Sequence, residues 1–425
     1  MPLGAGVVLL AAMARPAIGR HPTRLLDAAL LVCLLGVAVQ LIPLPGPIRD
    51  RLSPNGFAVD QVVALGAAPE THPRHPLSVD PQSTAWALML GAADIGLFWC
   101  ARAIFSRGGV RSTVRGVASL GLALTALVAV QRATSPDLLY WTWRPLNPGA
   151  SPYGPFVNRN SLATWLAMAL PPVIGYAMAR HQSARHGGRG VPGDRIDATQ
   201  VWLGGAAILM CGGLLASLSR AGILGGGVGL ITLIILSRKR LRGGASLAWM
   251  SSGFLVLVVL ASAYANLGKL ALRLQETTEQ GEWGRPAIWR DTWRMASDFW
   301  LTGLGAGAFQ RGMLVYQSGS RLFFFNHAHD EYLQLLAEGG LLIVVAAAIA
   351  LAAAVVLMAR RLNADRSAMF WVRAGAISGI AAVAVQSIWD TGLRTPANGA
   401  LFAVIAAIAV SEPAGAAASH QRASR

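Results

Sequence analysis

The chain has 425 residues, of which 54% are hydrophobic and 13% charged, and its mean hydropathy is +0.49. This composition excludes an intrinsically disordered chain and disfavours a set of soluble domains, and 3 cysteines are too few for a disulfide-stapled secreted scaffold. The formal net charge is +16. We therefore predict an all-α polytopic membrane protein.

Apolar runs of about the length that crosses a bilayer recur along the chain. Such runs are expected to be helices, because lipid offers an open backbone no hydrogen-bond partner. We predict about 11 transmembrane helices, within a range of about 10 to 12. The first run is read as a span and not as a signal peptide. The predicted spans are 3–13, 25–44, 84–104, 114–130, 162–179, 201–218, 221–236, 247–264, 341–358, 370–388 and 398–410.

Basic residues collect in every second connection, and their excess over acidic residues in those connections equals the whole net charge of +16. By the positive-inside rule these connections are cytoplasmic, so the long connections lie outside. Basic residues spread over short connections serve as topology signals, so no nucleic-acid partner is expected. We predict an N-terminal transmembrane bundle of about eight helices, then an outer loop, then C-terminal transmembrane helices with a short cytoplasmic tail. These parts cover 1–264, 265–340 and 341–425.

The long outer connections are expected to carry the function. The proline-rich segment 45–83 is predicted to form an ordered or semi-extended cover and not a domain. In the loop 265–340, helical spacing of aromatic residues predicts an amphipathic helix whose stripe lies at the lipid headgroups or on the bundle. The stripe consists of Trp289, Trp293, Ala296 and Trp300. Three alternating glycines after it, Gly303, Gly305 and Gly307, predict a turn.

The outer loop ends with a histidine motif, His327-Ala328-His329, followed by Asp330 and Glu331. Asn326 or His329 is the expected N-cap of the next helix. A histidine at a helix N-terminus is favoured in its neutral, proton-accepting form, which suits a general base. Two other interpretations stay open. The motif could hold a metal, although no further ligand cluster accompanies it, or the histidines could simply be hydrated at the membrane interface.

Two arginines are unusual. Arg220 separates two apolar runs, and an arginine near membrane depth costs about 2.5 to 3.5 kcal/mol at a helix centre. No acidic residue is close in sequence, so its partner is remote, solvent or an anionic ligand, unless it is a snorkelling residue that marks a helix end. Arg285 precedes Pro286, which fits a first helical position, and Glu282 is an alternative partner for it. Arg290 ranks lower as a ligand-binding candidate, as does Arg294, which has Asp291 and Asp298 three or four residues away.

Several of these motifs together resemble the O-antigen ligase family, which includes O-antigen and exopolysaccharide polymerases and protein O-oligosaccharyltransferases. The likeness is firm over about residues 150 to 410. Departures are Asp330 where the family often has Asn, Ala221 where Gly is frequent, and one span fewer. The matching segments are 156–161, 219–222, 284–309, 327–333, 338–340 and 390–398.

The resemblance implies a fold similar to the C-type membrane glycosyltransferases and an active site that faces the periplasm from the bacterial inner membrane. It implies an undecaprenyl diphosphate-linked glycan as donor and a glycan or lipid A core as acceptor, with no metal and no cofactor. By this likeness His329 or His327 is the catalytic histidine, and Arg220 and Arg285, with Arg290 behind them, hold the diphosphate. The resemblance assigns acceptor or supporting roles to Asn158, Asn160, Asp330, Glu331, Asp390 and Arg394.

We therefore expect an inverting glycosyltransferase in the lipid bilayer, acting as a polysaccharide or O-antigen polymerase or as an O-antigen ligase, with a slight preference for the polymerase. One alternative is a transporter or lipid-linked glycan flippase, in which Arg220 and Asp94 would line a path. That alternative predicts inverted repeats, which the sequence lacks. Another is an envelope scaffold, which would leave the histidines and Arg220 without a role.

Overall fold

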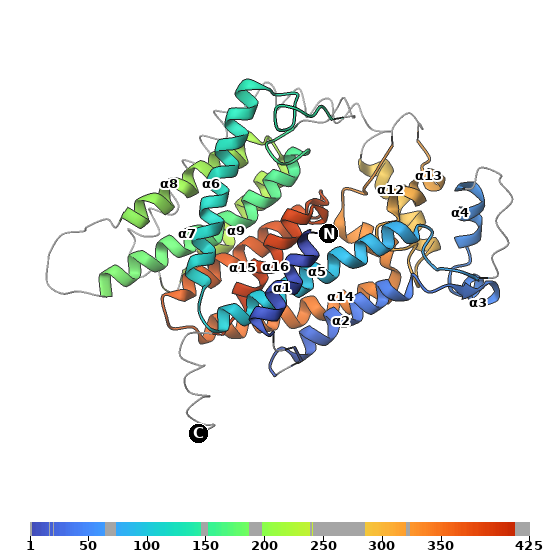
Figure 1. Ribbon diagram of the computed structural model, residues 1–425, viewed down its shortest axis with the longest axis horizontal. Coiled ribbons are helices and arrows are strands. Elements are labelled where there is room, and N and C mark those ends of the chain that lie inside the picture. The colour runs from blue at the N-terminus through green and yellow to red at the C-terminus, as the bar shows by residue number, and fades with distance from the viewer. Residues whose placement is uncertain are drawn as a thin grey trace. The chain divides into compact units, whose positions relative to one another are not determined.

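The computed structural model describes residues 2–16, 18–19, 21–63, 74–145, 152–186, 198–238, 240, 285–319 and 324–412. These ranges are mostly helical (Figure 1). The strands among them are β1 (Leu44–Pro45) and β2 (Arg74–His75), an antiparallel pair in which Leu44 lies opposite His75. The contacts group the chain into two compact units. The predicted division at residues 264 and 340 stays a prediction.

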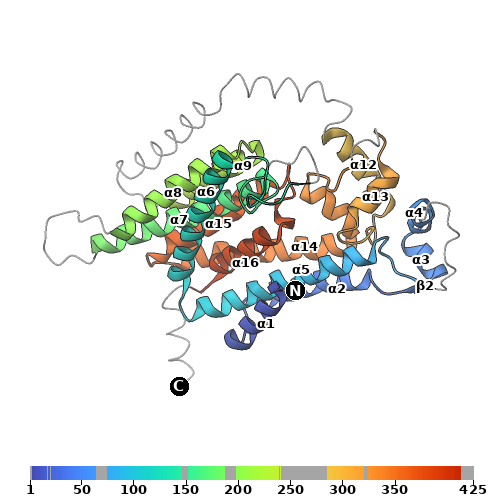
Figure 2. The same ribbon diagram turned by 45° about the horizontal axis from the view of Figure 1, so that its top comes forward.

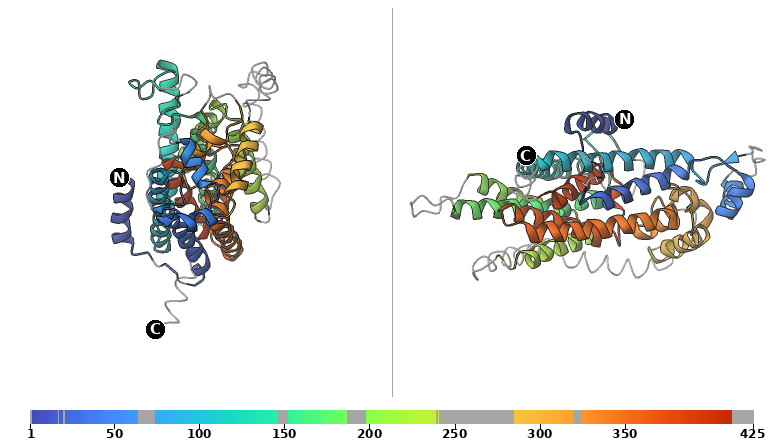
Figure 3. Two further views of the ribbon diagram at one scale, coloured as in Figure 1. Left: turned by 90° about the vertical axis from the view of Figure 1, so that its right-hand side faces the viewer. Right: turned by 90° about the horizontal axis from the view of Figure 1, so that it is seen from below.

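The first unit comprises Met1–Leu97, Ala271–Leu357 and Ser387–Thr391. Its helices α2, α5 and α14 lie side by side (Figure 3). Gly36 of α2 faces Ile343 of α14, and Gly91 of α5 faces Leu34 of α2. The helices of this unit, two of which continue into the second, are α1 (Pro2–Ala14), α2 (Arg24–Val39), α3 (Gly46–Leu52), α4 (Gly56–Val63), α5 (Pro81–Ser106), α12 (Arg285–Asp298), α13 (Phe309–Tyr316) and α14 (Glu331–Ala364).

The second unit comprises Phe98–Leu270, Met358–Gln386 and Gly392–Arg425. Glycines let its helices approach closely, as is typical of membrane helix packing. A side chain at Gly175 of α7 would clash with the backbone of α15, and one at Gly379 of α15 would clash with the backbone of α7. A side chain at Gly225 of α9 would also clash with the backbone of α15. Figure 2 shows these helices packed together. The elements of the unit are α6 (Val110–Thr134), α7 (Arg159–His186), α8 (Ala198–Ala216), α9 (Arg220–Ser237), α15 (Met369–Gln386), η1 (Gly392–Arg394) and α16 (Pro396–Val410).

The prediction of an all-α polytopic membrane protein is confirmed in its fold class, because the described residues are mostly helical and include several apolar helices of membrane-spanning length. Each predicted span coincides with a helix except 247–264, which lies outside the described residues. In the described ranges, 7 helices are long and apolar enough to cross a membrane, namely α5, α6, α7, α8, α9, α14 and α15. Helix α16 is apolar and shorter. The predicted total of about 11 spans stays a prediction.

A charged cluster closes one end of the second unit, on the side where the charge pattern predicts cytoplasm. The guanidinium of Arg373 lies 3.2 Å from a carboxylate oxygen of Asp365, and both side chains are buried. Arg373 also donates to the Ser411 carbonyl at 2.6 Å. Arg240 donates to the carbonyls of Asp365 and Ser367 and lies over the ring of Phe370, 3.9 Å from its centroid. This cluster joins the start of α15 to the end of α16.

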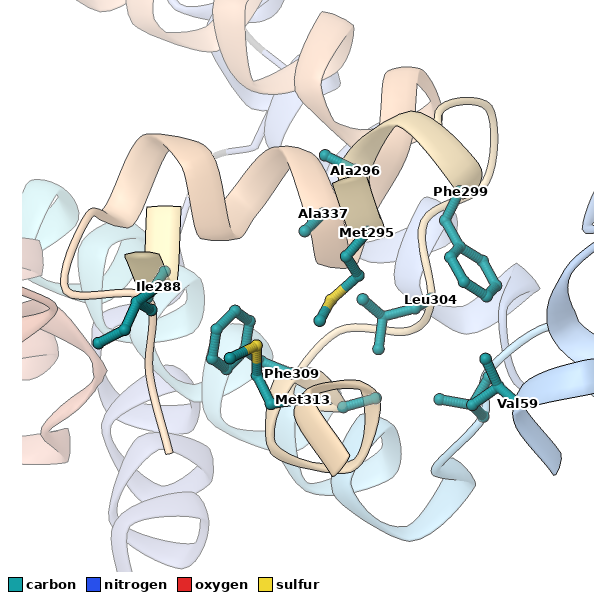
Figure 4. Close-up of a cluster of buried hydrophobic side chains, with 12 residues drawn as sticks. Val59, Ile288, Met295, Ala296, Phe299, Leu304, Phe309, Met313 and Ala337 are labelled. Atoms are coloured by element: carbon teal, nitrogen blue, oxygen red, sulfur yellow. The ribbon is translucent and has the colours of Figure 1, made fainter. Parts of the chain in front are cut away.

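The part of the first unit that contains α12, α13 and the start of α14 has a hydrophobic core of its own, shown in Figure 4. Side chains of α12 and α13 and of the intervening loop pack on the first turns of α14. The largest of them are Ile288, Met295, Phe299, Leu304, Phe309 and Met313. This core fixes α12 against the start of α14 and so positions the histidine motif.

The predicted amphipathic helix is present as α12, but its aromatic stripe does not form one buried face. Ala296 is buried in the core, whereas Trp293 and Trp300 are 60% and 56% exposed. Trp289 is half-buried and points its indole N–H at the histidine loop. Helical spacing alone predicted one face, but the face that became buried is the one that carries Ile288 and Met295.

The predicted glycine turn is confirmed. Gly303, Gly305 and Gly307 all have positive φ angles, of 70°, 117° and 77°. A side chain at Gly303 would lie 2.1 Å from the Glu338 carbonyl oxygen, so this turn requires glycine for its close approach to α14. In the same place α14 is broken at Gly340, which has φ 55°. The proline-rich segment 45–83 contains the second residue of β1, then α3, α4, β2 and the first residues of α5, with residues 64–73 outside the described ranges.

Candidate functional site

The histidine motif forms a short loop directly before α14, and Asp330 is the N-cap of that helix. Its Oδ1 accepts the backbone N–H groups of Tyr332 and Leu333, each at 3.0 Å. The expectation that Asn326 or His329 caps the helix is therefore wrong. A carboxylate is a strong N-cap because it satisfies free N–H groups and interacts with the positive helix end.

His329 is the residue that the loop constrains most. Its φ angle is 54°, in the left-handed region that side chains other than glycine rarely adopt. Its Nδ1 is buried, without a hydrogen-bond partner in the part of the chain that the structure describes. Burial, then the charges of Arg285 and His327, lower the pKa of His329 to about 4. The imidazole is therefore neutral at neutral pH and can accept a proton.

Arg285 is the first residue of α12 and lies near His329, whose pKa its charge lowers. It is exposed, and Arg290 is exposed on the same helix. The alternative partner Glu282 lies outside the described residues. The carboxylates expected to satisfy Arg294 have other donors, because Asp291 accepts the Ser318 hydroxyl and Asp298 accepts the Tyr316 hydroxyl at 2.6 Å.

Ala328, the residue before His329, is held on both sides. The Ala328 carbonyl accepts the indole N–H of Trp289 at 3.0 Å, and its N–H donates to Oε1 of Gln334 at 2.9 Å. The Gln334 amide nitrogen donates to Glu338 Oε1 at 3.0 Å and lies 3.4 Å from His327 Nδ1. Gln334 and Glu338 are polar side chains in an apolar run, spaced four residues apart on one helix face. That signal was available in the sequence, but it was overlooked.

Two further predicted residues lie in this unit. Glu331 begins α14, and its backbone N–H donates to the Ser387 carbonyl at 2.9 Å. Asp390 is buried in the segment Ser387–Thr391, which belongs to the same unit. The structure thus places His327, His329, Arg285, Arg290, Asp330, Glu331 and Asp390 in the first unit.

The remaining predicted residues share one end of the second unit. Arg220 begins α9 after its N-cap Ser219, whose hydroxyl accepts the Gly222 N–H at 3.3 Å. Gly222 leaves no room for a side chain beside Ala163, in the second turn of α7. The turn predicted at Arg220 is confirmed, since α8 ends at Ala216.

Helix α7 begins at the same end. Asn158 Oδ1 accepts the Asn160 N–H at 2.8 Å, which starts the helix. The Asn398 amide donates to the carbonyls of Ser161 and Gly392, at 3.0 and 2.8 Å, and so ties α16 and η1 to this start. Arg394 ends η1. Arg220, Asn158, Asn160 and Arg394 therefore lie together at one end of the unit, and their convergence with His329 stays a prediction.

In the described ranges no group of three or more His, Cys, Asp or Glu side chains has the arrangement of a metal site. The polar groups around His329 are instead the Gln334 amide, an indole, a guanidinium and carboxylates. These groups suit the binding and orientation of an anionic, hydroxyl-rich substrate.

Fold and site together define a multi-pass helical membrane protein with a constrained neutral histidine near an arginine, in a helical loop between membrane spans. Residues 205–348 match the family model described as O-antigen ligase, which confirms the resemblance to the O-antigen ligase family. No curated protein matches the chain in sequence. The family implies an enzyme that transfers glycans, as a ligase or a polymerase, with a lipid-linked glycan and an acceptor as substrates in a membrane.

Proposed function

We propose that this protein transfers a glycan from an undecaprenyl diphosphate carrier to an acceptor hydroxyl at the outer face of the bacterial inner membrane. The observation that supports this best is His329, a neutral and partly buried imidazole held in a strained conformation near the Arg285 guanidinium. Strained, desolvated side chains of this kind cluster at active sites.

The reaction assigns a separate task to each group. The acceptor oxygen bonds to the sugar C1 as the bond from C1 to the diphosphate oxygen breaks, which inverts the anomeric carbon. The acceptor proton passes to His329, and the lipid diphosphate leaves. Arg285 and Arg220 neutralise the leaving group, because planar guanidinium groups match phosphate oxygens bidentately. In this proposal the arginines take the place of a divalent ion.

Binding of the donor would also adjust the base. Arg285 is one cause of the low pKa of His329, after burial. A diphosphate on Arg285 offsets that positive charge, so the pKa of His329 rises when the donor is bound. The imidazole thus becomes a better base in the complex than in the free enzyme. Binding and proton transfer are coupled through Arg285.

The test uses the protein in lipid nanodiscs with a synthetic polyprenyl diphosphate-linked oligosaccharide, and products are identified by mass spectrometry. His329→Ala is expected to lower kcat by about 10² to 10⁴, the typical contribution of a general base. Arg285→Ala is expected to raise KM for the donor. The matched control is His181→Ala, an exposed histidine on α7, with full activity expected. Full transfer by the His329 variant would refute the role of His329.

Two further readouts concern the finer proposals. A chelator is expected to leave the rate unchanged, and the anomeric signal of the product is expected to be opposite to that of the donor. Movement of the intact lipid-linked probe across the bilayer without glycan transfer would instead support a flippase. Polymerase is our preferred form of the enzyme. Deletion in the native host would then leave single repeat units, whereas loss of a ligase would leave long unlinked chains.

A further inference from the structure

The role of His329 as a base does not explain how its strained backbone conformation is maintained. A histidine at φ 54° is strained, and such conformations persist only where the surrounding structure over-determines them. The residues after His329 are fixed by the Asp330 cap and by the bond from the Glu331 N–H to the Ser387 carbonyl at 2.9 Å. The residue before it must be fixed as well, or the chain would relax.

Two side chains provide that second restraint. The backbone N–H of Ala328 is bound by Gln334 and its backbone carbonyl by Trp289, at 2.9 and 3.0 Å. Ala328 itself is fully buried, and Gln334 is 1% exposed. Both groups of this residue therefore point in fixed directions. Because the Ala328 carbonyl and the His329 N–H belong to one planar peptide unit, this restraint also orients the backbone from which the His329 imidazole extends.

The orientation of the Gln334 amide is itself determined by Glu338. Glu338 Oε1 accepts the backbone N–H of Phe309 at 3.2 Å and therefore acts as a hydrogen-bond acceptor. The Gln334 atom that lies 3.0 Å from it must be a donor, which is the amide nitrogen. The amide oxygen is then left for the Ala328 N–H. The same nitrogen lies 3.4 Å from His327 Nδ1. This arrangement gives His327 an orienting role, whereas Nδ1 of His329 has no such neighbour among the described residues.

We propose that Gln334, oriented by Glu338, is a positioning residue that holds Ala328 and thereby keeps the His329 imidazole in place. The inference deepens the proposed function and rests on it as far as His329 is the base. Without the Gln334 bond the Ala328 N–H is freed, and residue 329 can return to an ordinary negative φ. The imidazole then leaves its buried place near Arg285.

The test variant is Gln334→Met, which keeps the length of the side chain and removes its hydrogen bonds. Hydrogen–deuterium exchange read by mass spectrometry should show faster exchange at the Ala328 amide. Exchange at the imidazole C2 position, followed across pH, should show that the pKa of His329 has risen from about 4 toward its ordinary value. With the synthetic donor, kcat should fall by about 100-fold with little change in KM, as is typical of a small misplacement.

The matched control is Gln131→Met. Gln131 is another fully buried glutamine, and its amide donates to the Leu138 carbonyl in the second unit. It should leave the exchange at Ala328 and the titration of His329 unchanged. Trp289→Phe is the second test variant, because it removes only the donor to the Ala328 carbonyl and keeps an aromatic ring. It should shift the same readouts in the same direction, and it replaces Gln334→Met as the test if that variant does not fold.

The proposal is overturned if a folded Gln334→Met protein keeps the wild-type exchange at Ala328 and the wild-type titration of His329, or, where that variant does not fold, if Trp289→Phe keeps both. Equal shifts in the Gln131→Met control would overturn it too. These two exchange readouts need no glycan donor. If the wild-type protein transfers nothing from the probe, the proposed function fails, and the exchange data still decide whether Gln334 positions His329.

Discussion

Two buried polar regions of the molecule are built in opposite ways. In the charged cluster of the second unit, Asp365 and Arg373 are both almost fully buried, and their groups are paired with each other and with backbone carbonyls and N–H groups. At the histidine loop of the first unit, the surroundings of His329 are well bonded, yet the Nδ1 atom of His329 has no partner among the described residues.

The difference separates a structural polar cluster from a functional one. Buried polar groups normally carry hydrogen bonds, and an unsatisfied atom costs free energy. The cluster around Arg373 stabilises the junction of α15 and α16, so a change in it should act on stability. In the loop around His329 the hydrogen bonds are made by the residues next to His329 and not by its Nδ1 atom. A change in the imidazole should therefore lower activity more than stability. The following predictions test that separation.

The largest effect is expected for Asp365→Asn. Removing one partner of a buried ion pair leaves the other charge uncompensated, which typically costs about 3 to 5 kcal/mol of unfolding free energy. We expect a clear fall in the thermal unfolding midpoint, measured by circular dichroism in micelles, while the transfer rate per folded molecule stays near wild type. A variant that kept its stability and lost activity would contradict the separation.

A smaller effect is expected from pH. The pKa of His329 in the folded state is about 4, below its ordinary 6.5, mainly because of burial. Between these values the unfolded chain binds a proton that the folded protein does not, so stability is complete above pH 6.5 and falls as pH decreases through this window. At pH 5 the loss is about 2 kcal/mol. The measurement is the stability difference between wild type and His329→Gln, which does not titrate. A difference independent of pH would show that His329 is not buried in its neutral form.

The sequence predicted the membrane helices well because a bilayer imposes length and hydropathy on each of them. It also indicated Arg220 through the cost of an arginine near membrane depth, and His329 and Arg285 through motifs that resemble the O-antigen ligase family. The sequence did not determine which hydrogen-bond partners these side chains have. Asn326, His329 and Asp330 are all acceptable N-caps within a few residues, and only the geometry selected Asp330.

The other errors have the same origin. The face of α12 that becomes buried depends on α13 and the start of α14, so the tryptophan spacing could not identify it. Gln334 and Glu338 were overlooked because their partners Ala328 and Phe309 are backbone groups, which sequence patterns do not show. Hydrogen bonds to backbone atoms carry no signature in the partner's residue type.

The smallest expected effect isolates the strain at residue 329. Left-handed backbone costs a residue with a Cβ about 1 to 2 kcal/mol, and glycine avoids this cost. His329→Gly and His329→Ala should be equally inactive, because both lack the imidazole, but the glycine variant should be more stable than the alanine variant by about 1 kcal/mol. Thermal unfolding of the two variants under one condition measures this difference. Equal stability would mean that residue 329 relaxes to a negative φ once the imidazole is gone, and the strain would then belong to the imidazole contacts and not to the peptide units that Gln334 and Asp330 hold.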